Sequence, residues 1–434
     1  MALTTRLGRN LALSYISPVI PTSWSGCATH GLLILRMSLH VISNMAAGQK
    51  LAAGLLNDYI YPRLNEWNKE NPSLLEPQFH ETNAACGAME IGRSLTHDTL
   101  PIVAIVLGGD GTVHELLEGM VRENGFIPDE VQIVLVPTGT ANALYHSVFG
   151  PGNAEDDHAW RFRSFDAFIK GDTTKCKPLT LIHVQPNNHV ASVVSSHSLH
   201  AAILRDSEAL RLSHPGIERF KMAAELNITS WCNACLTLIP PKDGKVLSYN
   251  AKEGKFLPTS NLDEDYVSLT NGQFQVFGSF AYMNAMVVDR LEPTFVPAPF
   301  AGFFCDESLR RPRNTIDIVV VRPPRSPKVF TEIQNGNEET NMRKEYAQDV
   351  LSTLIFEGMY SHGAHLNYTY KPDGHVELHG DGRYVVEYFR VGAYEWIAAS
   401  DDAQARTLCV DGTIEDVDKV SAHAKEKENI CIWS

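Results

Sequence analysis

The stretch VAIVLGGDGTVHELLEGM, residues 103–120, joins an aliphatic run to an amphipathic segment through the glycine-rich turn GGDGT. The run before Gly108 contains only Val, Ile, Leu and one Ala, which is typical of a strand buried on both faces of a parallel sheet. After the turn, apolar residues recur at helical spacing, namely Val113, Leu116, Leu117, Met120 and Val121. This spacing predicts one buried helix face. The stretch therefore predicts a strand that passes directly into a helix.

Two further segments repeat this strand-to-helix pattern. SLHVISNMAAGQKLAAGLLNDYI turns at Gly48, and VQIVLVPTGTANALYHSVF offers Thr140 as the N-cap of a helix that starts near Ala141. Buried strands that alternate with helices predict an α/β domain with a parallel sheet covered on both faces. Ligands of such sheets bind beyond the carboxyl ends of the strands, where all three turns are expected to lie.

Beyond residue 150 the pattern changes to short strand-like runs separated by turns. Helical segments interrupt them near 200–225 and 343–358, so we expect a β-rich second domain, a sandwich. Two polar stretches, 241–265 and 331–343, are predicted to be surface loops or insertions. The predicted division of the chain is an N-terminal extension over 1–37, an α/β domain over 38–150 and a β-rich domain over 151–434.

Composition narrows the class of protein. The 434 residues suggest two or three domains, and 44% apolar with 20% charged residues is ordinary for a globular protein. A net charge of −14 argues against a general nucleic-acid binder and against broad attraction to anionic membranes. Eight cysteines are too sparse for a disulfide scaffold and favour a reducing compartment. For the single CxxC, Cys232 and Cys235, core packing is favoured over zinc or redox use.

The N-terminal region has an unusual charge pattern. The first 57 residues contain no Asp or Glu, yet they carry Arg6, Arg9, Arg36 and Lys50. This resembles a transit peptide in charge, whereas Pro18 and Pro21 interrupt any long amphipathic helix, so a disordered extension is the alternative. No apolar run reaches the roughly 18 residues that span a bilayer. We expect a cytoplasmic protein, with mitochondrial targeting left open.

The turn Gly108–Thr112 has the physical features of a phosphate loop without either common spacing. It lacks the lysine of GxxxxGK[ST] and the order GxGxxG. Its glycines let backbone N–H groups approach a polyphosphate, and the following helix adds positive charge. Asp110 would repel phosphate unless Mg²⁺ bridges the two or the carboxylate accepts a proton from a hydroxyl. Alternatively Asp110 closes a turn, with Thr112 and Glu115 as a capping box.

GGDGT, followed about thirty residues later by PTGTANAL, resembles the catalytic domain of diacylglycerol kinases, which sphingosine, ceramide and bacterial lipid kinases share and to which NAD kinases are more distantly related. The turn SNMAAG, the segment HETNAACGAMEI, the E-x-x-R…R-F segment LRDSEALRLSHPGIERF and the D-G-E-like ARTLCVDGTIED extend the likeness from about residue 38 to the C-terminus. The resemblance implies an NAD kinase-like, Rossmann-type α/β domain followed by the β-rich sandwich.

The same resemblance implies a role for each matched residue. Asp110 would be the catalytic base or the anchor of Mg-ATP, and Arg211 and Arg219 would neutralise the transferring phosphoryl group. The residues that would bind ATP are Asn44, Gly48, Thr82, Gly108, Gly109, Gly111, Thr112, Glu115, Gly139, Thr140, Asn142, Glu208, Asp411 and Gly412. A surface ion pair between Glu208 and Arg211 is the alternative for those two, and a turn or cap role is the alternative for Asn142.

The chain departs from the family pattern at several positions. Met45 replaces the usual proline of the first loop, and Thr413 replaces the glutamate of D-G-E. Glu415 lies on the same face of the predicted strand, about 6–7 Å further along. Leu204 occupies the position of the aspartate that binds sphingosine, with Asp206 close by, so a partner for a sphingoid ammonium is not assumed.

The resulting hypothesis is an ATP-dependent lipid kinase, with ATP and Mg²⁺ as cofactors, that phosphorylates a hydroxyl of a sphingoid base, diacylglycerol or a related lipid. The second domain would supply the apolar pocket. The alternatives are an NAD kinase-type small-molecule kinase and a catalytically weak nucleotide-binding regulatory protein, which Thr413 favours.

Basic residues at both ends of one predicted strand are candidates for a peripheral contact with a membrane. RRPRNTIDIVVVRPPRSPK carries basic residues at both ends, namely Arg310, Arg311, Arg313, Arg322, Arg325 and Lys328. These six residues belong either to a pair of solvated loops or to a contact with anionic lipid.

Overall fold

The structure is a computed structural model that describes residues 37–71, 76–82, 85–97, 100–122, 130–152, 158–211, 213–214, 216, 218–260, 266–336, 339–425 and 428–434. Residues 36–434 form one compact unit. The predicted extension over 1–37 lies outside the described residues except for Met37.

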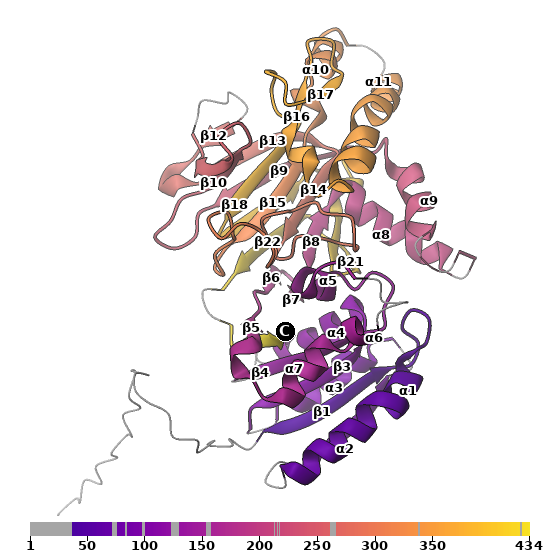
Figure 1. Ribbon diagram of the computed structural model, residues 1–434. Helices are drawn as coiled ribbons and strands as arrows, with labels where there is room; N and C mark the ends of the chain where they lie inside the picture. Colours follow the sequence, from indigo (N-terminus) through magenta and orange to yellow (C-terminus); the bar gives the residue numbers. More distant parts are fainter. Residues whose placement is uncertain are drawn as a thin grey trace, which may run out of the picture. The chain divides into compact units, whose positions relative to one another are not determined.

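The first sheet is parallel apart from one edge strand (Figure 1). Its order is β2 (Gln78–Thr82), β1 (Ser38–Asn44), β3 (Ile102–Gly108), β4 (Val131–Pro137), β23 (Ile430–Trp433) and β5 (Cys176–Pro178). Only β5 runs antiparallel to its neighbour, β23. All residues of β3 and β4 are buried, as their continuous aliphatic sequences predict.

Helices cover both faces of this sheet, and successive strand residues alternate between two cores. Ile105 packs in the core that also contains Leu64 and Phe165, whereas Val106 packs in the core with Leu116. The helices are α1 (Ala52–Leu55), which continues through a π-helical turn at Leu56–Ile60 into α2 (Tyr61–Glu70), then α3 (Gly87–Leu95), α4 (Asp110–Arg122), α5 (Ala143–Phe149), α6 (His158–Arg161) and α7 (Arg163–Lys170).

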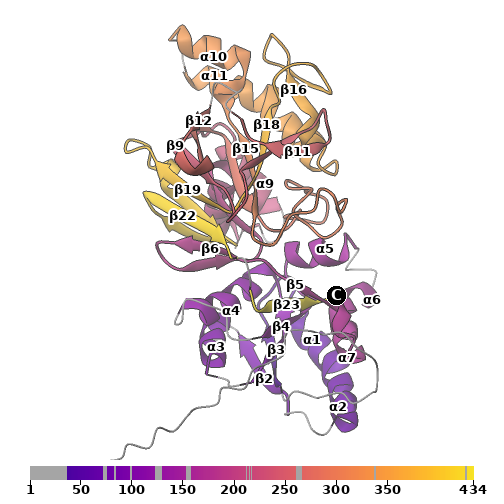
Figure 2. The same ribbon diagram turned by 90° about the vertical axis from the view of Figure 1, so that its left-hand side faces the viewer.

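The β-rich part is a sandwich of two antiparallel sheets (Figure 2). One has the order β11 (Lys255–Pro258), β10 (Leu247–Asn250), β18 (Val386–Val391), β15 (Ile316–Val321), β14 (Tyr282–Met286), β8 (Val194–His197), β20 (Thr407–Val410) and β21 (Thr413–Asp416). The other has β12 (Tyr266–Ser268), β13 (Phe274–Phe280), β9 (Cys232–Ile239), β19 (Ala393–Ala398), β22 (Lys419–Ala424), β6 (Ile182–Gln185) and β7 (His189–Ala191). Leu236 and Trp396 of the second sheet pack with Ile318 and Phe389 of the first. The predicted fold class, a parallel α/β domain followed by a β-rich sandwich, is confirmed.

Helices and a small hairpin complete the β-rich part. They are α8 (Ser198–Leu210), α9 (Glu218–Asn227), α10 (Pro327–Gln334), α11 (Glu339–Tyr346) with π-helical turns at Ala347–Leu351 and Thr353–Met359, and the pair β16 (Tyr368–Tyr370) and β17 (Val376–Leu378). The two stretches predicted to be surface loops or insertions contain regular elements. The first holds the β10–β11 hairpin, whose strand β10 pairs with β18, and the second overlaps α10 and α11. Polar composition did not indicate these elements, because exposed edge strands and surface helices are polar as well.

The chain end returns to the first sheet, where β23 pairs with β4 and β5. Cys176 and Cys431, with Cα atoms 5.7 Å apart, form a disulfide that the sparse cysteines did not predict, because 255 residues separate them. Strands from beyond residue 150 thus complete the α/β sheet, while the division of the chain at that residue stays a prediction. Cys232 and Cys235 are not disulfide-bonded. None of the helices in the described ranges combines the length and apolar character that a bilayer span requires.

Candidate functional site

Three turns meet at the carboxyl edge of the parallel sheet. The residue pairs Asn44–Thr82 and Gly108–Pro137 lie side by side where their strands end. Thr138 N donates to Gly108 O over 3.0 Å, which joins the second turn to the third. The Asn44 side chain donates to Oγ1 of Thr112 over 2.9 Å, which joins the first turn to α4. The three turns predicted to form one site are therefore in mutual contact.

Close packing explains why the turns are built from glycine. A Cβ on Gly109 would lie 2.8 Å from the Cα of Gly139, and one on Gly48 would lie 2.3 Å from Thr138 O. Gly48 also has a φ of +48°, a conformation that glycine adopts without strain. A Cβ on Gly111, in contrast, would meet nothing within 4 Å. Open space therefore lies beside the start of α4.

Asn142 closes the third turn. Its side chain accepts a hydrogen bond from Gly139 N (3.0 Å) and donates one to Gly139 O (2.9 Å). Its φ of +51° lies in the left-handed region, which asparagine tolerates better than most residues. Both hydrogen bonds stay within the turn, as expected for the turn or cap role that the sequence analysis gave as the alternative to an ATP contact.

Asp110 caps a neighbouring helix. Its two carboxylate oxygens accept hydrogen bonds from Ala143 N (2.8 Å) and Leu144 N (3.0 Å), the first residues of α5. Burial raises the pKa of the half-buried Asp110 to about 6, the two backbone donors oppose this rise, and the charge of Asp411 adds to it. The carboxyl group is thus more basic than an ordinary aspartate and fixed in orientation.

Asp411, predicted to contact ATP, is enclosed by donors from the start of the β-rich part. It accepts hydrogen bonds from the N–H groups of Ser192, Val193 and Val194 and from the Ser192 hydroxyl, over 2.6–3.1 Å. Burial raises its pKa, while His114, 3.9 Å away, lowers it. Asp411 therefore ties the strand after the D-G-T motif to the loop before β8.

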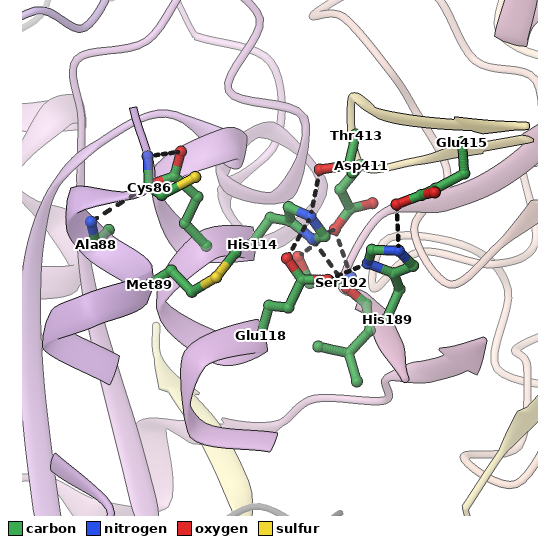
Figure 3. Close-up of polar contacts among 12 residues, drawn as sticks. Cys86, Ala88, Met89, His114, Glu118, His189, Ser192, Asp411, Thr413 and Glu415 are labelled. Atoms are coloured by element: carbon green, nitrogen blue, oxygen red, sulfur yellow. Dashed lines mark hydrogen bonds and ion pairs between the residues drawn. The ribbon is translucent and has the colours of Figure 1, made fainter. Parts of the chain in front are cut away.

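A chain of acidic and imidazole groups, buried except for Glu415 at its far end, extends from Asp411 (Figure 3). His114 contacts Val190 O through Nδ1 and Thr413 Oγ1 through Nε2, both at 2.9 Å. One helical turn on, Glu118 pairs with Nδ1 of His189, whose Nε2 lies 3.0 Å from Glu415. The chain links α4 to β7 and β21.

Sequence reasoning missed most of this chain. His114 and Glu118 are one helical turn apart on α4, a spacing that places them on the same face and that could have been noticed. Nothing in the local sequence marks His189 as their partner. The carboxylate of Glu415, two residues beyond Thr413, is engaged by His189 and by Asn187.

Glu115, another predicted ATP contact, caps the N-terminus of α3 rather than that of its own helix, α4. Its carboxylate accepts hydrogen bonds from Cys86 N (3.4 Å) and Ala88 N (3.3 Å) at the start of α3. The capping box proposed with Thr112 is absent from α4, since this helix begins at Asp110 and places Thr112 inside its first turn. Thr82, also predicted to contact ATP, is buried, and its carbonyl accepts from Met45 N.

Of the arginines of the E-x-x-R…R-F segment, Arg211 directly follows α8 and Arg219 lies on α9. Arg211 and Glu208 form an exposed ion pair of 2.7 Å, the alternative that the sequence offered. Arg219 is buried against the ring of Phe220, and its Nε has no hydrogen-bond partner within the described part of the chain. Asp206 is engaged by Arg205 and Asn227, both at 2.7 Å. Among the described residues, the hydrogen bonds and ion pairs of Arg211 and Glu208 do not reach the three turns.

The turns fit the phosphates of a nucleoside triphosphate better than they fit a metal ion alone. The space beside Gly111 adjoins the N-terminus of α4, where unpaired N–H groups favour phosphate. Within the described ranges, no cluster of three or more His, Cys, Asp or Glu could hold a metal by itself. Mg²⁺ commonly needs only one or two carboxylates together with phosphate oxygens. Asp110 is the carboxylate at these turns, and the sequence predicted for it either this contact or the role of base.

Residues 38–179 match the sequence profile of the diacylglycerol kinase catalytic domain. The chain carries a diacylglycerol kinase catalytic domain. The match includes the three turns and Asp110, and it confirms the resemblance to a lipid kinase family. No curated protein matches the chain significantly.

Two solved structures are similar to this chain. One, described as a putative diacylglycerol kinase from Bacillus anthracis str. Sterne, is 12% identical, with 91% of this chain and 97% of that chain aligned at a TM-score of 0.50. Another, described as a diacylglycerol kinase from the same organism, is 13% identical, with 92% and 97% aligned at a TM-score of 0.48. At 12% identity, the first of these two structures shows a similarity of fold and nothing more.

Proposed function

We propose that the chain is an ATP-dependent lipid kinase that transfers the terminal phosphoryl group of ATP to a hydroxyl of a sphingoid base, diacylglycerol or a related lipid. The observation that carries this proposal is the position of Asp110. Its carboxylate lies where three glycine-rich turns meet, and its pKa is raised to about 6. The kinase domain match supports the reaction type, and the acceptor is proposed by analogy with the lipid kinases that share the domain.

Asp110 would act as the general base. The hydroxyl oxygen of the acceptor forms a bond to the terminal phosphorus, the bond to the bridging oxygen breaks, and ADP leaves with the electron pair. The hydroxyl proton passes to the Asp110 carboxylate. With a pKa near 6 this group is largely ionised at neutral pH yet more basic than an exposed aspartate. Its bonds to Ala143 N and Leu144 N hold it in one orientation.

Positioning and charge supply the rest of the catalysis. The turns at Gly48, Gly108–Thr112 and Gly139–Asn142 would hold the phosphates, and bound Mg²⁺ would neutralise their oxygens. Arg219 stays in the proposal as a phosphate contact, because its buried Nε has no hydrogen-bond partner in the described structure. Arg211 is the weaker candidate, since Glu208 already pairs with it.

A second candidate is a nucleotide-binding protein with little or no turnover. The observation that favours it is Thr413, which stands where the family has a glutamate and donates or accepts a hydrogen bond with His114 instead of offering a carboxylate. Nothing comparable among the described residues favours an NAD kinase-type activity, so NAD serves as a control acceptor.

The test is transfer of radiolabelled phosphate from Mg-ATP by the full chain to a panel of sphingoid bases, diacylglycerols and ceramides, with NAD as an additional acceptor. The wild-type protein is expected to label at least one lipid. Asp110→Asn should abolish the label, whereas Asp172→Asn, which alters an exposed carboxylate, should retain it. Thermal unfolding of both variants would show whether they fold.

The alternatives give different results. Tight ATP binding without labelling of any lipid would favour the nucleotide-binding protein. Labelling of NAD alone would favour the small-molecule kinase. Equal labelling by wild type and a folded Asp110→Asn would remove the proposed base.

A further inference from the structure

Helix α4 meets the β-rich part at the edge strands of both sandwich sheets. β7 is the last strand of one sheet and β21 is the last strand of the other. Two rows of polar contacts, one helical turn apart, run from α4 across β7 to β21 (Figure 3). The helix that follows the glycine-rich turn is therefore tied to both sheets of the sandwich at one junction.

The first row begins at His114. Its Nδ1 lies 2.9 Å from the carbonyl oxygen of Val190 on β7, and its Nε2 lies 2.9 Å from Oγ1 of Thr413 on β21. A carbonyl group only accepts hydrogen bonds, so Nδ1 carries a hydrogen, whereas a hydroxyl group can donate to Nε2. A neutral imidazole ring therefore satisfies both contacts of the first row.

The second row has a different requirement. The carboxylate of Glu118 on α4 is bonded to Nδ1 of His189, and the carboxylate of Glu415 on β21 lies 3.0 Å from Nε2 of the same ring. Ionised carboxylates accept hydrogen bonds and do not donate them, so both ring nitrogens must donate. Only the imidazolium form of histidine has two donors. On the neighbouring strand β6, the residue opposite His189 is the uncharged Val184.

Burial makes the charge of the second row depend on its pairing. The side chains of Glu118 and His189 are each 1% exposed, whereas that of Glu415 is 30% exposed. Buried charges are costly unless they are paired, and two carboxylates in contact favour the charged ring over the neutral one. The other titratable groups at the junction are those around the first row, where His114 lies 3.6 Å from Glu118 and 3.9 Å from Asp411.

We propose that His189 is a proton-dependent clamp, whose imidazolium ties α4 to β21 and whose loss of one ring proton to solvent loosens that tie. A neutral ring would turn a lone pair towards one of the two carboxylates, which removes a buried hydrogen bond. The first row would remain, since it needs no additional proton. Loosening of α4 reaches the glycine-rich turn, because the helix begins at Asp110. This property goes beyond the proposed transfer reaction and does not depend on it.

The protonation of His189 can be measured directly by nuclear magnetic resonance of the full chain with isotopically labelled histidine ring nitrogens. The signals of His189 are those absent from His189→Gln or, should that variant not fold, those that Glu415→Gln displaces. Both nitrogens are expected to show the imidazolium pattern at about pH 7.5, where an unperturbed histidine is mostly neutral. A neutral ring at this pH, with Glu118 protonated in its place, would overturn the proposal.

Hydrogen exchange of the backbone amides tests the clamp itself. Protection factors, which are corrected for the intrinsic effect of pH on exchange, are measured by mass spectrometry between about pH 6 and about pH 9. The peptides that cover α4 and β21 are expected to lose protection by at least about tenfold as the pH rises, because the imidazolium is lost. The peptides of the pair β9 and β13 should change by less than about twofold.

Glu415→Gln separates charge from hydrogen bonding. The amide oxygen still accepts from Nε2 of His189, but one of the two charges that favour the imidazolium is gone. The pH at which α4 loses protection should therefore fall by about one unit. Glu395→Gln is the matched control, since Glu395 is 33% exposed on a strand of the same sandwich and pairs with Lys419. It should leave this pH unchanged.

Three further results would overturn the proposal. One is protection of α4 that stays constant over the whole pH range. Another is an equal loss of protection in β9 and β13, which would mean that the whole fold, and not the junction, responds to alkaline pH. The third is a midpoint that is the same in Glu415→Gln as in wild type, which would assign a purely structural role to the contact.

Discussion

Nε2 of His114 lies 2.9 Å from Oγ1 of Thr413, although 299 residues separate the two in the chain. This contact joins α4, the helix that follows the glycine-rich turn, to the first residue of β21. Thr413, at the position where the sequence resemblance led us to expect a glutamate, therefore helps to hold α4 against the β-rich part.

Thr413→Val is expected to lower the free energy of unfolding by about 1 kcal/mol, because it removes the hydroxyl and leaves a buried imidazole nitrogen with one partner fewer. Urea denaturation of the two proteins measures the difference. Thr413→Ser keeps a hydroxyl and is the matched control, expected to stay within about 0.5 kcal/mol of wild type. Equal destabilisation by both variants would show that the threonine methyl group, and not the hydrogen bond, matters.

Gly139→Ala is expected to destabilise the protein by about 1–3 kcal/mol and to weaken ATP binding. The added Cβ would lie 2.5 Å from the Cα of Gly109, so the second and third turns must move apart. Chemical denaturation and equilibrium binding of ATP are the two measurements. Gly54→Ala, on α1 with its nearest contact at 4.0 Å, is the control and should leave both quantities unchanged or raise stability slightly. Wild-type ATP affinity in a folded Gly139→Ala protein would argue against the turns as the nucleotide site.

Much of the α/β domain follows from sequence because its determinants are local. The buried run before Gly108 and the helical spacing after it specify β3 and α4, and parallel strands bring their carboxyl ends together. His189 and the return of β23 to the first sheet could not be predicted in this way, since they depend on pairings between distant segments. Charge pattern alone likewise could not show that Arg322 meets Glu387.

The pH dependence of phosphoryl transfer should reflect Asp110. A general base must be ionised, so kcat/KM is expected to rise with pH through about 6 and to level off above it. A profile that is flat between pH 5 and pH 7, or that falls, would contradict the proposed role of this carboxylate.

The stability of the fold should change with pH in the opposite direction. Since the folded pKa of Asp110, about 6, exceeds its ordinary value of 3.8, the folded protein binds the proton more tightly between these values. The contribution of this group to stability is complete below about pH 4 and is lost as pH rises through 6. The difference in unfolding free energy between wild type and Asp110→Asn should therefore decrease over this range, whereas the difference for Asp172→Asn should stay constant.

Glu387→Gln is expected to lower the free energy of unfolding by about 3–5 kcal/mol, because it leaves two buried guanidinium groups without their carboxylate. Glu387 accepts from Arg322 (2.7 and 2.8 Å), from Arg325 (3.2 Å) and from the Tyr266 hydroxyl (2.7 Å). Burial opposes ionisation, but the two arginines outweigh it and lower the pKa of Glu387 to about 2.

The lowered pKa of Glu387 also determines how its ion pairs with Arg322 and Arg325 depend on pH. Its stabilisation is complete above the ordinary pKa of 4.5 and is lost as pH falls towards 2. Urea denaturation at a series of pH values should show the gap between wild type and Glu387→Gln closing over this range. Glu395→Gln, which alters a partly exposed partner of Lys419, should cost less than about 1 kcal/mol at every pH. A gap that stays constant down to pH 2 would mean that packing, rather than the charge of Glu387, accounts for the loss.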